Sequence, residues 1–299
     1  MKSLYFLKVS RYNIKWKKMK GILSMLIDCH NHSLYSFDGS EKVEDICSNA
    51  EALGLSVFAL TDHCDMIGGP TAEALKVSIA GSVNELCAWR ESHQSPCRML
   101  CGIELGDPLE NPALAEEMIR LAPYDVIIGS IHTDGVSDYY FGNYSDATDQ
   151  QLHESLERYF LRQCEMADWG KFDVLAHMTY PLRYIVGDYG RSVRLERYSS
   201  LIDRLFRTII KKEIVLEINT SGLRQKIGVT LPDQALLTRY RELGGRLITL
   251  GSDAHTLKDM AFGIEQTEHE LARLGFTELT WFEKRQMRHT PLPAPGGTT

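Results

Sequence analysis

The sequence lacks any uninterrupted run of about 18 apolar residues, the length at which a helix can span a bilayer. Basic residues are not in excess either, because 33 Lys and Arg stand against 40 Asp and Glu and the net charge is -7. A general nucleic-acid-binding protein would carry a basic surface. The seven cysteines include no C-x-x-C pair, which favours buried, reduced thiols. These absences predict a cytoplasmic protein with no membrane or nucleic-acid partner, and they leave its oligomeric state unknown.

The two ends of the chain differ from the middle. Residues 1–24 carry seven basic residues and no acidic one, and their apolar residues are too dispersed for a signal peptide. We expect a disordered arm or an upstream start codon before Met25, with a membrane- or RNA-binding tail as the alternative. Residues 291–299 are rich in Pro, Gly and Thr and are expected to be flexible. Residues 25–290 show no internal linker, which predicts one domain.

Short apolar runs alternate with segments of helical periodicity between these ends. The runs cover residues 26–30, 57–63, 99–104, 126–132, 174–177, 215–219 and 247–255. Apolar residues at helical spacing predict helices over residues 41–53, 73–89, 112–121, 150–169, 194–212, 233–243 and 260–274. Such alternation predicts a parallel sheet with helical crossovers, either an open doubly wound sheet or a closed barrel.

Nine imidazole and carboxylate side chains lie at or near the ends of these runs: His30, His32, Asp38, His63, Glu104, His132, His177, Asp253 and His255. Members of the pairs His30–His32 and Asp253–His255 are two residues apart and so face the same way on a strand. Any one of the histidines could be an ordinary core or surface residue, and Asp38 could be present only because aspartate is common in turns. Together they predict a barrel, because a barrel brings the carboxyl ends of all its strands to one mouth.

These side chains have the chemistry of metal ligands. Imidazole and carboxylate without thiolate favour zinc, manganese or iron. Nine ligands are too many for one ion, so two or three divalent ions are expected. Asp38, Glu104 and Asp253 would supply about three negative charges against about six positive ones from three ions, which predicts an anionic substrate such as a small phosphoester. Arg183 and Arg224 follow the fifth and sixth runs and could bind its phosphate, although each could equally be a surface residue.

Several motifs resemble the PHP (polymerase and histidinol phosphatase) family. They are Asp28-Cys29-His30-Asn31-His32, Thr61-Asp62-His63, Gly102-Ile103-Glu104, Gly129-Ser130-Ile131-His132, Leu175-Ala176-His177 and Gly251-Ser252-Asp253-Ala254-His255. Residues 217–224, 274–277 and 281–285 are similar to the stand-alone histidinol-phosphatase branch of that family. The resemblance covers almost the whole chain after Met25. It implies an α/β fold, a single-domain, distorted TIM-like (β/α)7 barrel with a metal site at the C-terminal ends of its strands.

The resemblance also implies a trinuclear centre and a reaction. One ion would be held by His30, His32, Glu104 and Asp253, a second by Asp38, His63 and His255, and a third by Glu104, His132 and His177. Asp62 would orient the ligands without binding a metal itself. The implied reaction is hydrolysis of L-histidinol phosphate to L-histidinol and phosphate by a metal-bound hydroxide, a step of histidine biosynthesis. Arg183 and Arg224 would balance the charge of the phosphate, and Asp253 or His255 would deliver the proton to the leaving group.

Other functions remain open at this point. The same site could act on another small phosphoester, such as a nucleotide or a sugar phosphate, because fold and metals do not fix the substrate. The hypothesis of a metal-dependent amidohydrolase is weakened by the absence of an obvious bridging lysine at a strand end. A metal-stabilised interaction module without enzymatic activity would be expected to have lost some of the nine ligands. For recognition of the rest of the substrate, the predicted mouth loops offer Tyr35, Asp138, Tyr139 and Tyr140.

Overall fold

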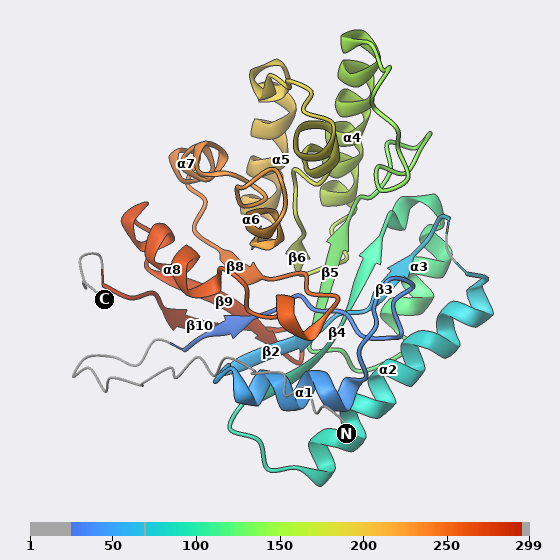
Figure 1. Ribbon diagram of the computed structural model, residues 1–299, viewed down its shortest axis with the longest axis vertical. Coiled ribbons are helices and arrows are strands. Elements are labelled where there is room, and N and C mark those ends of the chain that lie inside the picture. The colour runs from blue at the N-terminus through green and yellow to red at the C-terminus, as the bar shows by residue number, and fades with distance from the viewer. Residues whose placement is uncertain (1–24, 69, 295–299) are drawn as a thin grey trace, which may run out of the picture.

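Seven parallel strands form the centre of the molecule (Figure 1). The computed structural model describes residues 25–68 and 70–294, so the predicted arm over residues 1–24 lies outside the described residues. The strands follow one another in the sheet in the order β1 (Ile27–Asp28), β2 (Val57–Leu60), β4 (Arg98–Gly106), β5 (Val126–Ser130), β6 (Val174–Leu175), β7 (Val215–Asn219) and β8 (Ile248–Gly251). Each begins within or just beside one of the predicted apolar runs.

Backbone hydrogen bonds join the first strand to the last. The amide of Cys29 donates to the carbonyl of Leu250 at 2.8 Å, and the amide of Asp253 donates to the carbonyl of His30 at 2.8 Å. A third bond, 2.9 Å long, runs from the amide of His32 to the carbonyl of Ala254. The sheet is therefore nearly closed into a TIM-like barrel, and the predicted fold class is confirmed.

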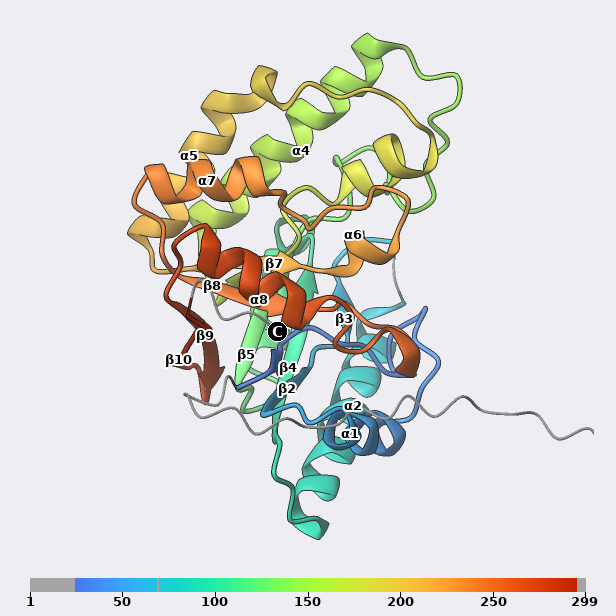
Figure 2. The ribbon, with the colours of Figure 1, turned by 60° about the vertical axis from the view of Figure 1, so that its left-hand side comes forward.

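Within residues 25–68 and 70–294, seven α-helices of eight or more residues surround the sheet (Figures 1 and 2). They are α1 (Val43–Ala52), α2 (Ala72–Ser92), α3 (Pro112–Ile119), α4 (Asp149–Trp169), α5 (Ser199–Lys211), α7 (Gln234–Glu242) and α8 (Ile264–Arg273). Side-chain caps fix several starts: Thr148 forms a capping box with Gln151 at α4, and Asp233 accepts the amide of Leu236 at α7. The predicted helix over residues 194–212 instead begins as a 3-10 turn, Leu195–Tyr198, which runs directly into α5.

Two elements have no counterpart in the sequence prediction. The short strand β3 (His63–Asp65) leaves the end of β2 and pairs with the second half of β4, with His63 opposite Glu104. An antiparallel hairpin of β9 (Glu278–Glu283) and β10 (Gln286–Pro291) lies beside β8 (Figure 2). Its second strand includes Pro291, the first residue of the segment predicted to be a flexible tail, while residues 295–299 lie outside the described part. The domain limits of 25 and 290 stay a prediction.

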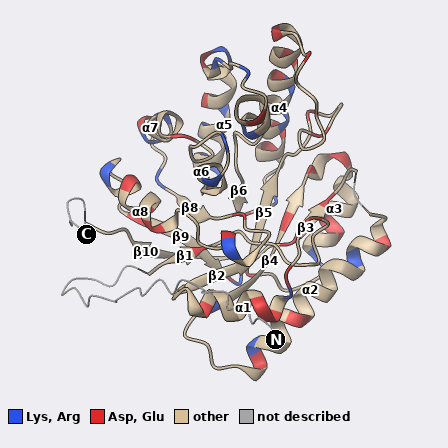
Figure 3. Ribbon diagram, in the orientation of Figure 1, with Lys and Arg blue, Asp and Glu red and all other residues tan. Residues whose placement is uncertain are grey.

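The surface and the thiols agree with the composition. Acidic and basic residues are interspersed along the helices that surround the sheet (Figure 3). All seven cysteines are free and six of them are buried, as expected, although a cytoplasmic location stays a prediction. No helix in residues 25–68 and 70–294 is long and apolar enough to cross a membrane.

Candidate metal centre

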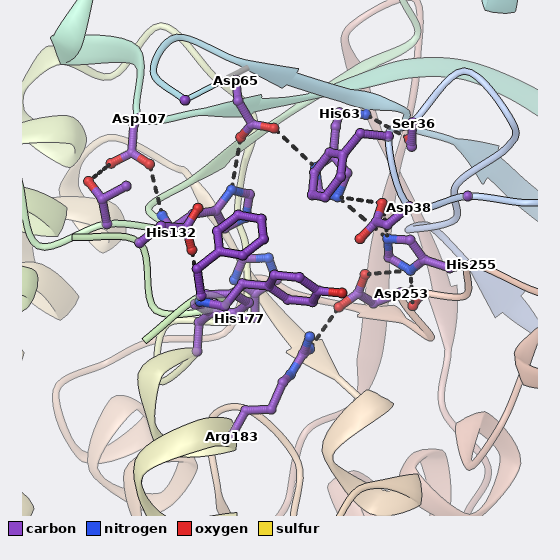
Figure 4. Close-up of a pocket in the computed structure, with 18 of the residues that line it drawn as sticks. Ser36, Asp38, His63, Asp65, Asp107, His132, His177, Arg183, Asp253 and His255 are labelled. Carbon is purple, nitrogen blue, oxygen red and sulfur yellow. Dashed lines mark hydrogen bonds and ion pairs between the residues drawn. The ribbon is translucent and has the colours of Figure 1, made fainter. Parts of the chain in front are cut away.

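The nine predicted ligands converge at the carboxyl ends of the barrel strands (Figure 4). The loop after β1 supplies two histidines and Asp38, β3 and β4 supply His63 and Glu104, and the segments after β5, β6 and β8 supply the others. Six of them line a cavity of about 1000 Å³: Asp38, His63, His132, His177, Asp253 and His255. His30, His32 and Glu104 are buried beside these six.

Glu104 lies at the centre of the cluster. Its Oε1 is 2.9 Å from Nε2 of His177 and 3.1 Å from Nε2 of His132. Its Oε2 is 2.9 Å from Nδ1 of His63 and 3.3 Å from Nε2 of His30. Burial alone would raise the pKa of Glu104, but the charges of His63, His30 and His132 hold that pKa well below its usual value. Glu104 is therefore a buried carboxylate shared by several imidazoles.

The remaining ligands lie beside this carboxylate. Nε2 of His32 is 3.4 Å from Oδ1 of Asp253, and Nε2 of His255 is 3.2 Å from Oδ1 of Asp38. Nε2 of His255 is also 3.4 Å from Nε2 of His63, which joins the two halves of the cluster. Asp38 thus belongs to the site rather than to its turn alone.

Two glycines make the close approach of these segments possible. A Cβ at Gly39 would overlap the carbonyl oxygen of Ser33 in the turn that carries Asp38. A Cβ at Gly251 would overlap His30 and the carboxylate of Glu217. The ligand-bearing loops therefore depend on bare backbone at these positions.

Two ligands lie on strained backbone. His177 has a φ of 21° and Asp253 a φ of 52°, although neither is glycine. Non-glycine residues rarely adopt positive φ, and such residues cluster at functional sites where the surrounding structure holds them. The backbone of both residues is held by hydrogen bonds: the amide of His177 donates to Oε2 of Glu217 at 2.8 Å, and that of Asp253 donates to His30.

Unpartnered buried atoms show that the cluster suits metal ions. Nε2 of His30, Nε2 of His32, Nδ1 of His63, Oε2 of Glu104 and Oδ1 of Asp38 are buried without a hydrogen-bond partner. Buried polar atoms without partners are costly, and metal coordination would satisfy them. Imidazole and carboxylate donors without thiolate fit zinc, manganese or iron.

Three overlapping groups have ligand atoms within 4.8 Å of one another: His30, His32 and Glu104; His32, His63 and His255; and His63, Glu104 and His132. Each group contains at least two members of one of the three ligand sets that the resemblance implies. The clustering of potential metal ligands is thus evident, whereas the number of ions and the assignment of each ligand stay predictions.

A serine relay explains the role expected for Asp62. This buried carboxylate accepts hydrogen bonds from the hydroxyls of Ser33 at 2.8 Å, Ser36 at 2.7 Å and Ser82 at 2.5 Å. Because the Ser36 hydroxyl donates to Asp62, its oxygen can accept the Nδ1 proton of His32, which lies 3.0 Å away. The tautomer of His32 is then fixed with Nε2 facing the cluster.

Sequence reasoning missed two carboxylates that orient the ligands. Oε1 of Glu217, on β7, lies 2.6 Å from Nδ1 of His30. Oδ1 of Asp65 lies 2.9 Å from Nδ1 of His132 (Figure 4). Glu217 could have been found from the two-residue periodicity of a strand, because it precedes Asn219 by two, whereas the position of Asp65 depends on the pairing of β3 with β4.

The two predicted arginines both line the cavity, but their surroundings differ. Nη2 of Arg183 donates to Oδ2 of Asp253 at 2.8 Å and to Oγ of Ser221 at 2.6 Å. Arg224, at the end of α6 (Ser221–Arg224), donates from Nη1 and Nη2 to the carbonyls of Ser252 and Asp253 at 2.6 and 2.7 Å. Arg183 therefore contacts a site carboxylate directly, whereas Arg224 holds the backbone of the last ligand loop.

Charge also sets the state of Asp253. Burial would raise the pKa of this carboxyl, but the imidazole of His32 beside it and the charge of Arg183 hold its pKa well below the usual value. Asp253 is an anion at neutral pH.

The four mouth-loop residues separate into two groups. Tyr35, Asp138 and Tyr140 line the cavity. Tyr139 is wholly buried, and its hydroxyl lies 2.8 Å from Oγ of Ser155 on α4. The suggestion that Tyr139 contacts substrate was wrong, because adjacent residues of this loop point to opposite sides. The Tyr35 hydroxyl donates to Glu85 at 2.6 Å, away from the ligands.

The sequence profile of the PHP domain matches residues 28–221, a span that contains seven of the nine clustered ligands. The chain belongs to the PHP domain family. A protein of Thermotoga maritima named as a probable histidinol-phosphatase is 29% identical over 254 residues, which cover 85% of this chain and 94% of that protein. A histidinol-phosphatase of Lactococcus lactis is 27% identical over 260 residues, covering 86% of this chain and 94% of the relative.

Solved structures agree with this PHP assignment. The crystal structure of histidinol phosphate phosphatase from Lactococcus lactis, complexed with zinc, L-histidinol and phosphate, superposes with a TM-score of 0.74 at 25% identity. The match covers 88% of this chain and 99% of that one. A structure from Listeria monocytogenes, with a TM-score of 0.66 and 17% identity, shares the fold.

Proposed function

We propose that this PHP protein is a metal-dependent phosphomonoesterase that hydrolyses L-histidinol phosphate to L-histidinol and phosphate. The observation that carries the proposal is the set of buried imidazole and carboxylate atoms that meet around Glu104 at the barrel mouth, several of them without a hydrogen bond. The histidinol-phosphatases that match nearly their full length to this chain support the substrate.

Two or three divalent ions would be held by the nine clustered side chains. Ions of this kind lower the pKa of water and neutralise the charge of a phosphoryl group. The chain's own contribution is to present its imidazoles in one tautomer. Glu217 would fix His30, Asp65 would fix His132, and the Ser36–Asp62 relay would fix His32.

Arg183 is the better placed of the two arginines to contact the phosphate. Its guanidinium lines the cavity and is oriented by Asp253 and Ser221, so it can stabilise charge on the phosphoryl oxygens as the reaction proceeds. Arg224 would act by holding the carbonyls of Ser252 and Asp253.

The reaction forms a bond from a water oxygen to phosphorus and breaks the bond from phosphorus to the ester oxygen. The leaving alkoxide takes one proton. Asp253 is held as an anion by its neighbours and is therefore a poor proton donor. Of the two residues predicted for this role, His255 is the better one, and it would deliver the proton through water in the cavity, because its ring nitrogens face Asp38 and the carbonyl of Asp253.

A second candidate is hydrolysis of another small phosphoester, such as a nucleotide or a sugar phosphate. The cavity of about 1000 Å³ has room for a larger phosphoester as well.

A substrate panel separates the two candidates. Metal-loaded protein would be given L-histidinol phosphate, a nucleoside monophosphate, glucose 6-phosphate and p-nitrophenyl phosphate, and phosphate release would be followed. We expect kcat/KM for histidinol phosphate to exceed the others by at least about a hundredfold. The Glu104→Gln variant, which lacks the central carboxylate charge, is the negative control. No release from histidinol phosphate together with good turnover of another ester would refute the proposal.

A further inference from the structure

One carboxylate at the cavity has no cationic partner. The other five aspartates that line it face a histidine, an arginine or a lysine: Asp38, Asp65, Asp107, Asp188 and Asp253. Asp138 accepts the amide of Tyr140 at 2.8 Å, and within residues 25–68 and 70–294 no Lys, Arg or His forms an ion pair with it. Burial raises the pKa of Asp138 by more than the amide of Tyr140 and the charges of His132 and His63 lower it, so a further cation beside this carboxylate would stabilise it.

Three exposed aromatic side chains, Phe37, Tyr140 and Phe141, line the same mouth, and the first two come from different loops. Phe37 is 65% exposed and Tyr140 is 49% exposed, and both line the cavity. Their rings meet edge to face with centroids 6.3 Å apart, although one comes from the loop after β1 and the other from the loop after β5. Phe37 also stacks on His63 at 5.3 Å, so this aromatic pair adjoins the metal ligands. Exposed aromatic faces gathered at a cavity mark a binding surface, and such faces attract cations.

The cavity therefore carries charge of both signs. Arg183 and the ions would favour an anion at the ligand cluster, whereas Asp138 places a negative charge on the loop after β5. A substrate that matches both charges carries a phosphate at one end and a positive charge at the other. Asp188, the other carboxylate of the outer cavity, is already paired with Lys226 at 3.2 Å.

We propose that Asp138, together with the aromatic faces of Phe37 and Tyr140, binds the cationic and aromatic end of the substrate and selects phosphomonoesters whose alcohol carries an amine. This inference rests on the proposed function only in placing the phosphate at the metal ligands. Asp138 and the two rings are specificity-determining residues, and they take no part in bond breaking.

The charge is tested with Asp138→Asn. The measured quantity is the ratio of kcat/KM for phosphoethanolamine, which carries an ammonium group, to kcat/KM for glycerol phosphate, which does not. Loss of one charge-assisted contact should lower this ratio by about tenfold to a hundredfold. Asp188→Asn is the matched control, and it should change the ratio less than about twofold because Asp188 is neutralised by Lys226. The ratio is unaffected by any loss of folded or metal-loaded protein, since both esters are measured on one preparation.

The ring is tested with Tyr140→Leu and Tyr140→Phe. The leucine variant should lower kcat/KM for histidinol phosphate relative to phosphoethanolamine by about threefold to tenfold, and the phenylalanine variant should retain the wild-type ratio because it keeps the aromatic face.

An unchanged charge ratio in Asp138→Asn, or an equal fall in Asp188→Asn, would overturn the inference. These outcomes differ from failure of the proposed function. If the wild type does not hydrolyse histidinol phosphate but Asp138→Asn still abolishes a preference for phosphoethanolamine, the function fails and the cation site stands. If histidinol phosphate is the best substrate and the charge ratio does not change in Asp138→Asn, the proposed function stands and the cation site fails.

Discussion

Replacing Glu217 by Gln should weaken metal binding although Glu217 is not a predicted ligand. The carboxylate accepts from Nδ1 of His30 at 2.6 Å and from the amide of His177 at 2.8 Å, and it is buried at the inner face of β7. An amide offers one acceptor oxygen where the carboxylate offers two, so the NH2 group must face one of these two donors. Either His30 loses the bond that fixes its tautomer, or the strained backbone at His177 loses its support.

The magnitude follows from that lost bond. A buried donor left without an acceptor costs about 1 to 3 kcal/mol, and at about 1.4 kcal/mol per factor of ten this predicts a loss of about tenfold to a hundredfold in metal affinity. The same range is typical when a carboxylate behind a metal-bound histidine is removed. Activity should recover when excess metal is supplied, because the ligands themselves remain.

Competition with a chelator of known affinity measures the effect, and activity against free metal concentration gives a second readout. Asp173→Asn is the matched control. Asp173 is also largely buried, accepts the amide of Ile127 at 2.8 Å and pairs with Arg285, but it lies at the start of β6, at the opposite end of the barrel. It should lower the melting temperature without changing metal affinity. Unchanged metal affinity in Glu217→Gln, or an equal loss in Asp173→Asn, would refute the reasoning.

Three further predictions concern the same site. Burial would lower the pKa of His63, but neighbouring carboxylates raise it to about 9 in the metal-free protein; metal affinity should therefore rise with pH up to about 9, and calorimetry in two buffers should detect proton release on binding. Arg183→Ala should lower kcat/KM by about a hundredfold to a thousandfold, and Arg224→Ala by about tenfold, since Arg224 donates to carbonyls; equal losses would contradict these roles. Ser36→Ala removes the acceptor for Nδ1 of His32 and should weaken metal binding about tenfold in the chelator assay, whereas an unchanged affinity would exclude the relay.

The sequence predicts the barrel because its signal is local and repeated. Each strand is a short apolar run, and each crossover helix has its own periodicity, so the order of elements follows without knowledge of long-range contacts. Ligands such as His30 and Asp253 stand at the ends of such runs. Their convergence follows from the geometry of parallel strands alone.

The C-terminal hairpin shows where that signal ends. Its turn residues Lys284 and Arg285 have φ values of 52° and 60°, a conformation usually given to Gly or Asn. The turn is held by distant contacts, since the amides of Lys284 and Arg285 donate to Asp125 at the start of β5. Sequence preferences cannot report a turn that tertiary contacts impose.

The supporting carboxylates are a different case. Asp65 reaches His132 only because β3 turns aside to pair with β4, a register that no local pattern contains. The different surroundings of Arg183 and Arg224 depend on irregular segments: Arg183 begins a π-helical turn, Arg183–Asp188, and Arg224 ends a single helical turn. Periodicity is silent on such segments. The resemblance to the PHP family favours Arg224 over Arg183 as the phosphate ligand, whereas the contacts of the two side chains favour Arg183.

The number of metal ions bound by each chain tests the central claim most directly. Protein would be loaded with zinc or manganese, freed of excess metal and measured by elemental analysis, with anomalous diffraction locating the ions. The account predicts two or three ions per chain around Glu104, each in contact with the clustered imidazoles. A single ion or none would contradict it.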